Sequence, residues 1–100
     1  MYLSYKSIGI DEVKMLSSAL ELNTSLVSLH LRGNFIGIEE TKVISRIIET
    51  NSTLRSLDLG DNCIGSEGLE MICKSLEINP TLTLIDISNN NIGIEGAKPI

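Results

Sequence analysis

Three side chains of this 100-residue chain, Ser28, His30 and Asp58, are of the types that make a hydrolytic triad. A serine nucleophile also needs a strained elbow, an oxyanion hole and a substrate pocket. The residues around these three follow a plain alternating pattern that offers none of those features. We therefore interpret the three as outward-facing positions of a sheet, and the sequence predicts no catalytic residue.

The two cysteines and the single histidine are the natural candidates for a metal site. Zinc sites pair their ligands a few residues apart, and Cys63, Cys73 and His30 do not match any such spacing. Two cysteines also cannot build a disulfide scaffold, so we expect reduced thiols. The glycine-containing turns lack the Lys-Ser/Thr ending of a phosphate-binding loop. The sequence therefore predicts no metal and no cofactor.

The overall charge narrows the class of partner. Eight Lys and Arg face thirteen Asp and Glu, which gives a net charge of −5, so binding to nucleic acid is not expected. No apolar run approaches the roughly 18 residues of a membrane span. The first residues contain no apolar stretch of signal-peptide length, which favours a cytoplasmic protein without membrane contact.

The chain repeats itself at an offset of 28 residues, and no insertion is needed to keep the copies aligned. Three aligned sets illustrate this: Leu26, Leu54 and Leu82; Asn34, Asn62 and Asn90; and Gly9, Gly37, Gly65 and Gly93. Repeats of this length indicate a stacked array, because one unit cannot bury its apolar face alone.

Within each copy, the spacing of the apolar residues changes from that of a strand to that of a helix. Residues 26–34, 54–62 and 82–90 alternate apolar and polar, which predicts strands, and helical spacing follows each glycine, as in Thr41, Ile44 and Ile48. We expect the asparagines at 34, 62 and 90 to form a hydrogen-bonded ladder between copies at the bend after the strand. We also expect positive φ or close backbone approach at the repeated glycines, and left-handed backbone at the asparagines that follow the helices, at 23, 51 and 79.

The pattern L-x-x-L-x-L-x-x-N-x-I-G-x-E-G resembles the leucine-rich repeat, and its length and helix opening are similar to the ribonuclease-inhibitor-like subfamily. NOD-like receptors and the Ran GTPase activator belong to that group. The resemblance implies an α/β fold: a right-handed solenoid with a concave parallel sheet and convex helices. Residues 1–100 then form a single domain of about three and a half repeats. The incomplete copies at the two ends leave open a longer array, and open sheet edges favour self-association.

The outward face of the predicted sheet is the candidate binding surface. One column runs Tyr2, His30, Asp58 and Asp86, with neighbours about 5 Å apart. Two carboxylates at that spacing repel by about 0.8 kcal/mol in water, which suggests a partner with a basic surface. The predicted partner-binding residues are Tyr2, His30, Arg32, Asp58, Asp61, Asp86 and Asn89.

The sequence thus predicts a non-catalytic module that binds a protein partner on its concave sheet. One alternative is a GTPase-activating protein similar to the Ran activator, with Arg32 as the single arginine on the predicted concave face. A second alternative is a protein similar to ribonuclease inhibitor, although that family has longer, cysteine-rich chains with two alternating repeat types.

Overall fold

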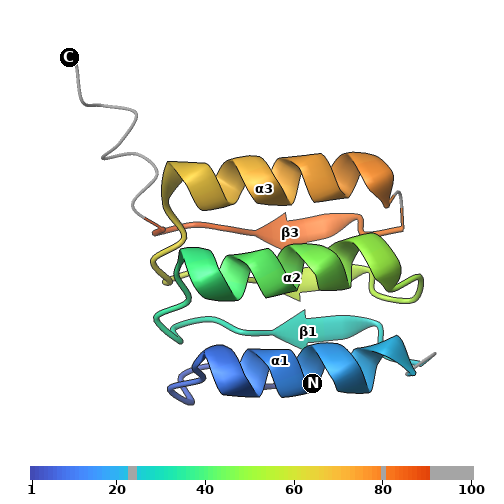
Figure 1. Cartoon of the computed structure of the whole chain (residues 1–100), viewed down its shortest axis with the longest axis horizontal. Coiled ribbons are helices and arrows are strands. Elements are labelled where there is room, and N and C mark those ends of the chain that lie inside the picture. Colours follow the sequence, from blue (N-terminus) through green and yellow to red (C-terminus); the bar gives the residue numbers. More distant parts are fainter. Residues whose placement is uncertain (23–24, 80, 91–100) are drawn as a thin grey trace.

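The computed structural model describes residues 1–22, 25–79 and 81–90. Its elements alternate in the order α1 (Ile10–Glu21), β1 (Ser28–His30), α2 (Ile38–Thr50), β2 (Ser56–Asp58), α3 (Gly65–Ile78) and β3 (Leu84–Asp86). The helices stack in one layer, and the strands form a second layer behind it in the view of Figure 1. This arrangement confirms the predicted α/β solenoid.

The strands form one parallel sheet in the order β1–β2–β3. Leu29 pairs with Leu57, and Leu57 pairs with Ile85, so the sheet keeps the 28-residue offset of the sequence. The segment before α1 extends the sheet through a parallel bridge between Tyr2 and His30. Residues at one repeat position therefore lie side by side.

The core lies between the two layers and is aliphatic. Leu29 and Leu57 point into it from the strands, and Ile44 and Ile72 meet them from the helices. The predicted alternation and the helical stripe are therefore confirmed. Burial of each such side chain contributes roughly 1.5–3 kcal/mol, and the repeats share this core because each one covers its neighbour.

The predicted asparagine ladder is present at the bend after each strand. The Asn62 side-chain oxygen accepts the backbone N–H groups of Asn34 and Ile36 at 2.7 and 3.0 Å. Its nitrogen donates to the carbonyls of Leu31 and Leu59, each at 3.0 Å. One buried side chain thus satisfies backbone groups in two successive repeats, where water cannot reach them.

A second ladder lies at the other end of the helices. Asn51 and Asn79 have φ values of −85° and −113°, so the expectation of left-handed backbone at these positions was wrong. Both are buried instead, and the Asn51 side-chain oxygen accepts the N–H groups of Thr53 and Leu54. The Asn51 side-chain nitrogen donates to the carbonyl of Leu20 in the preceding repeat at 3.4 Å. Asn23, the remaining member of the set, lies outside the described residues.

The helix starts also differ from expectation. Gly9 and Gly37 have φ values of −104° and −112°, and each donates its N–H to a glutamate three residues later. Gly65 does have positive φ, but Gly68 occupies the glutamate position of the third repeat, so the Gly65 N–H donates to the Asn90 carbonyl. Positive φ recurs instead in the bend after each strand, at Tyr5, Gly33, Asp61 and Asn89. Gly93 lies outside the described residues.

Candidate functional site on the concave sheet

The outward row of the sheet is assembled as the repeat offset predicts. His30 pairs with Asp58, Asp58 pairs with Asp86, and Tyr2 bridges to His30. Parallel pairing holds these side chains on one face, because residues at the same repeat position point the same way. The sheet therefore brings together residues that are far apart in the sequence.

Arg32 is the centre of this face. Its three guanidinium nitrogens each bind a different carboxylate: Nε binds Asp58 at 3.1 Å, Nη1 binds Asp61 at 3.0 Å and Nη2 binds Asp86 at 2.6 Å. Asp58 and Asp61 belong to the next repeat and Asp86 to the one after it. We call these four residues the Arg32 cluster. The cation offsets the repulsion expected between Asp58 and Asp86, and the cluster keeps a formal charge of −2.

Each carboxylate of the Arg32 cluster is also held by its second oxygen or by a neighbour. Asp58 Oδ1 accepts the N–H of Gly60 at 3.0 Å, and Asp86 Oδ1 accepts the hydroxyl of Ser88 at 2.7 Å. Asp61 Oδ1 accepts the side-chain amide of Asn89 at 2.8 Å. These bonds fix the acidic groups before any partner arrives, which lowers the entropy lost on binding.

Gly60 provides the space in which the guanidinium lies. A Cβ atom at this position would come within 2.4 Å of Arg32 Cζ. Gly33 has the same relation to Tyr5, because a Cβ there would come within 2.2 Å of the tyrosine ring. The sequence shows both glycines at strand-end positions, but their effect depends on how far a side chain from the preceding repeat reaches.

Tyr5 is a site residue that the sequence analysis did not select. Its hydroxyl donates to Asp61 Oδ2 at 3.1 Å, although the two residues are two repeats apart. The available signal was its place in one aligned set with Gly33, Asp61 and Asn89. That alignment brings the four residues to the same edge of the sheet.

Tyr2 and His30 form the aromatic end of the concave face. Their rings stack with centroids 4.5 Å apart and an angle of 8° between the planes. Ser28 Oγ lies 2.9 Å from His30 Nε2. The Asp58 carboxylate binds Arg32 and Gly60, so these three side chains do not assemble in the described structure in the order Ser–His–Asp that a hydrolytic triad uses.

The electrostatics of the site favour ionised carboxylates. The hydrogen bond from Asn89, followed by those from Arg32 and Tyr5, lowers the pKa of Asp61. Hydrogen bonds from the Ser88 backbone and hydroxyl, aided by the charge of Arg32, lower the pKa of Asp86. The bond to Asp61 raises the pKa of the Tyr5 phenol, and the carboxylates raise the pKa of Arg32. All four groups therefore keep their usual charge at neutral pH.

The cysteines and other potential metal ligands do not form a site in the described residues. Cys63 and Cys73 are free and exposed. Within residues 1–22, 25–79 and 81–90, no set of three or more His, Cys, Asp or Glu side chains is arranged to hold a metal ion. In the same part of the chain, no helix is long and apolar enough to cross a membrane.

Comparison with known proteins identifies the class. The family model of the Leucine Rich repeat matches residues 22–38, 50–73 and 79–100, which is more than half of the chain, and the chain belongs to this family. A solved structure described as leiomodin-1 actin-binding site 2 matches with a TM-score of 0.82 at 25% sequence identity. That match covers 91% of this chain and 53% of the other.

A second solved structure, the C-terminal domain of tropomodulin from Caenorhabditis elegans, matches with a TM-score of 0.82 at 17% identity. The match covers 91% of this chain and 55% of that one. The chain thus spans about half the length of both structures. Comparison with curated protein sequences finds no match.

Proposed function

We propose that the chain is a non-catalytic, cytoplasmic interaction module that binds a protein partner with a basic surface on its concave sheet. The Arg32 cluster supports this proposal most directly, because it presents three fixed carboxylates around one cation on the open face of the sheet. The cluster and its neighbours comprise the proposed contact residues Tyr2, His30, Arg32, Asp58, Asp61, Asp86 and Asn89. A cationic partner would reduce the remaining negative charge.

Actin is the first partner to test, because the similar leiomodin-1 structure is described as an actin-binding site. Purified monomeric actin would be titrated into the chain and the Kd measured by fluorescence. We expect the Asp58→Asn/Asp86→Asn variant to weaken binding about tenfold, which corresponds to about 1.4 kcal/mol. The variant Glu39→Gln/Glu67→Gln makes the same change of net charge on the helices and should bind like the wild type.

Two results would distinguish an error in the proposed binding surface from an error in the proposed partner. Equal weakening in the sheet variant and the helix variant would mean that total charge, and not the concave face, governs binding. No binding of actin to the wild type would eliminate actin as the partner. In that case, selection of peptides that bind the immobilised chain would test the concave surface without actin.

The geometry disfavours the first of the two alternatives from the sequence, the GTPase activator. A GTPase activator that supplies Arg32 would have to release it from three carboxylates, whereas this side chain is only 24% exposed. We therefore expect no stimulation of GTP hydrolysis by the Ran GTPase when the purified chain is added. A role like that of ribonuclease inhibitor, and membership of its subfamily, rest only on the length and helix opening of the repeat.

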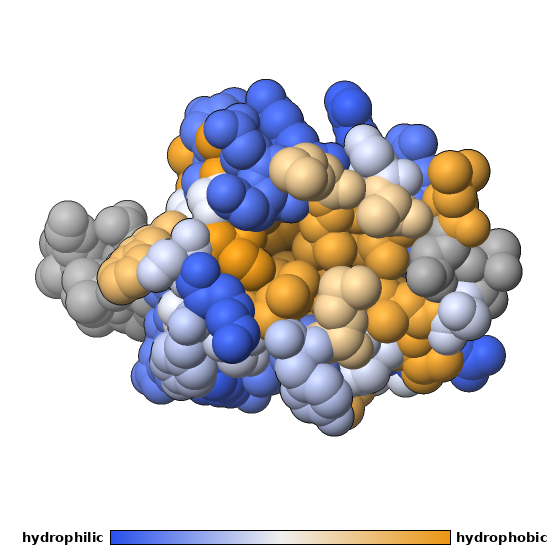
Figure 2. Space-filling model, turned by 90° about the horizontal axis from the view of Figure 1, so that it is seen from below, coloured by the Kyte–Doolittle hydropathy of each residue, from blue (hydrophilic) through white to orange (hydrophobic). Residues whose placement is uncertain are grey.

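Self-association is a second candidate property, and the end of the solenoid at α1 supports it. Figure 2 shows apolar side chains gathered around a hollow at this end. Met15 and Leu22 are 70% and 88% exposed there, and Leu3 and Leu16 are only half-buried. A second copy that covered this surface would remove it from water.

Sedimentation equilibrium over a range of concentrations tests self-association. We expect the wild type to form dimers or larger species that Met15→Glu weakens, because the change places a charge on the apolar end. Val27→Glu alters an exposed apolar residue just before β1 and should not affect assembly. A monomeric wild type at all concentrations would contradict this proposal.

A further inference from the structure

The aromatic residues of this protein are all outside its core. The chain has two tyrosines, one phenylalanine and no tryptophan. Tyr2, Tyr5 and Phe35 are 79%, 65% and 76% exposed, while the buried apolar residues are Leu, Ile and Val. Aromatic side chains bring the largest apolar area to a core or an interface. Here most of that area is available for contact with another molecule.

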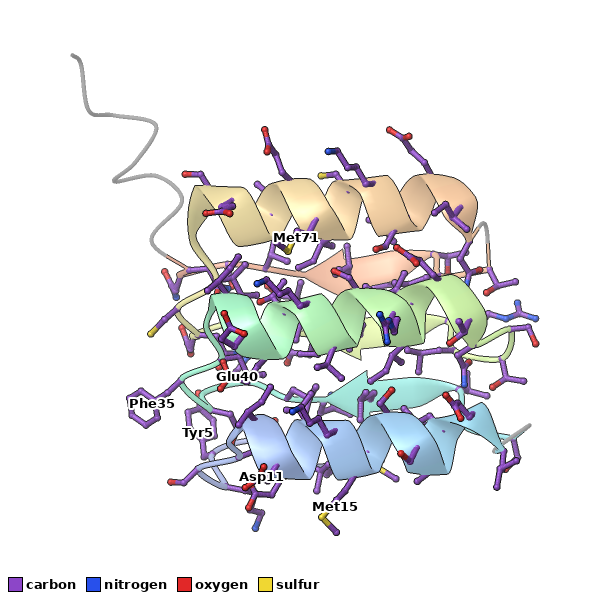
Figure 3. The ribbon with its side chains drawn as sticks, in the orientation of Figure 1. Tyr5, Asp11, Met15, Phe35, Glu40 and Met71 are labelled. Atoms are coloured by element: carbon purple, nitrogen blue, oxygen red, sulfur yellow. The ribbon has the colours of Figure 1, made fainter. Side chains whose placement is uncertain are left out.

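Phe35 is the least expected of the three on folding grounds. Its φ is 57°, a region that costs a side-chain-bearing residue roughly 1–2 kcal/mol. Ser7 holds the same turn position in the preceding repeat with a φ of 54°, so a small polar residue suits this backbone. The Phe35 ring projects beyond the end toward which the strands point, and Tyr5 lies at the same end among the loops (Figure 3). Neither packing nor backbone conformation accounts for a phenylalanine here.

Tyr2 and Tyr5 are continuous with the Arg32 cluster, and Phe35 lies at the same end of the molecule as Tyr5 (Figure 3). Tyr5 occupies the space above Gly33, and its hydroxyl binds Asp61 of the cluster. Tyr2 stacks on His30, which pairs with Asp58 in the adjacent strand. One surface therefore joins an acidic area of formal charge −2 to exposed aromatic rings.

We propose that Tyr2, Tyr5 and Phe35 form an aromatic rim that extends the concave binding site over the ends of the strands. The rim takes a protein segment that carries a Lys or Arg next to an apolar side chain. The cation is attracted by the carboxylates and by the tyrosine ring faces, and the apolar side chain packs on Phe35. Tyrosine is enriched among the residues that dominate binding energy, and phenylalanine is enriched at protein interfaces. This inference rests on the proposed function and names the chemistry of the partner.

The groove between α1 and α2 on the opposite side does not carry an equivalent argument. It has a volume of about 470 Å³ and is lined by both cations and anions, among them Lys14, Lys42, Arg46, Glu21 and Glu39. Its charges are mixed and it contains no aromatic ring. The groove therefore selects no particular partner chemistry.

A random linear peptide library displayed on phage provides a probe that does not require the natural partner. The library would be selected on the immobilised full chain, and the most enriched peptide would be synthesised and titrated by calorimetry. We expect this peptide to contain Lys or Arg beside an apolar residue. We also expect Phe35→Ser to weaken its binding about tenfold or more.

Ile78→Ser is the matched control, because it removes an exposed apolar side chain at the last residue of α3, away from the rim. It should leave the Kd unchanged. Phe35→Ser places at this turn the residue found at Ser7, so thermal unfolding should show a fold at least as stable as the wild type. A normal melting curve would establish that weaker binding arises from the lost ring and not from unfolding.

The outcomes distinguish this inference from the proposed function. Equal binding by Phe35→Ser and the wild type, with loss in Asp58→Asn/Asp86→Asn, would overturn the aromatic rim and leave the concave site in place. Enriched peptides without a cation would overturn the partner chemistry. Failure of the library to enrich any peptide would overturn the aromatic rim, while the actin titration would still decide the proposed function. Peptide binding that neither variant changes would overturn both proposals for the concave surface.

Discussion

Arg32 shows how one long side chain can organise a surface made of several repeats. It binds carboxylates from the two repeats that follow its own, and each of its three nitrogens has a different partner. The sequence places Asp58 and Asp86 in one column, but it does not indicate that an arginine from the neighbouring column reaches both. The reach of a flexible side chain depends on its rotamers and on the empty space above Gly60.

Gly60→Ala should displace the Arg32 guanidinium without disturbing the fold. The new Cβ would lie within 2.4 Å of Arg32 Cζ, and the flexible end of the arginine can move away. Because Arg32 helps to lower the pKa of Asp61, NMR titration should show a higher Asp61 pKa in the variant. Ser4→Ala, at the same strand position two repeats earlier, serves as the control. An unchanged Asp61 pKa would show that the glycine is not needed for this contact.

Acid should destabilise the chain through Asp61 and Asp86. Their folded-state pKa values lie below the ordinary value near 4, so they stabilise the fold above that pH. This stabilisation is lost as the pH falls through the lower folded-state values, because the protonated groups no longer accept the hydrogen bonds of Asn89 and Ser88, or bind Arg32, as anions. Thermal unfolding between about pH 6 and about pH 2 should therefore be less acid-sensitive in Asp61→Asn/Asp86→Asn than in the wild type. The same acid sensitivity in both would contradict the argument.

The strands and helices were the part of the fold that the sequence predicted best. Alternating and helical periods are local properties, and the fixed offset then determines the register, as in the pairing of Leu29 with Leu57. The functions of individual asparagines and glycines were harder to predict. Asn51 binds backbone groups through its side chain instead of adopting left-handed backbone, and this difference depends on burial that only neighbouring repeats create.

The helix starts carry a signal that the sequence analysis overlooked. Gly37 and Glu40 have the spacing at which a glutamate accepts the N–H of the residue before the helix, and they form that bond at 2.9 Å. Glu40→Ala should lower the free energy of unfolding by about 1 kcal/mol, because this N–H loses its acceptor. Glu39→Ala, a neighbouring exposed glutamate, should change it by less than about 0.5 kcal/mol. Urea denaturation of both variants compares them directly, and equal effects would rule out the capping bond as the cause.

The two asparagine ladders hold the repeats together as one molecule. Asn62→Ala would leave buried N–H groups of Asn34 and Ile36 without an acceptor. At roughly 1–3 kcal/mol for each unsatisfied group, we expect a loss of about 3 kcal/mol or more in the free energy of unfolding. Asn89→Gly, at an exposed asparagine with positive φ, should lose less than about 1 kcal/mol. Chemical denaturation monitored by circular dichroism would test this, and similar losses in the two variants would disprove the importance of the ladder.

Two contacts of the concave face skip a repeat: Arg32 to Asp86, and Tyr5 to Asp61. The usual statistical treatment of solenoids assigns an energy to each unit and to each pair of adjacent units. In this protein that treatment needs a further coupling between next-nearest neighbours. A second copy of residues 26–53 inserted after the first would let the copied arginine keep the contacts of Arg32. It would also put the copied Gly33 where Tyr5 now meets Asp61, so the Tyr5 contact would be lost. We therefore expect the lengthened protein to unfold less cooperatively than the larger core alone would predict.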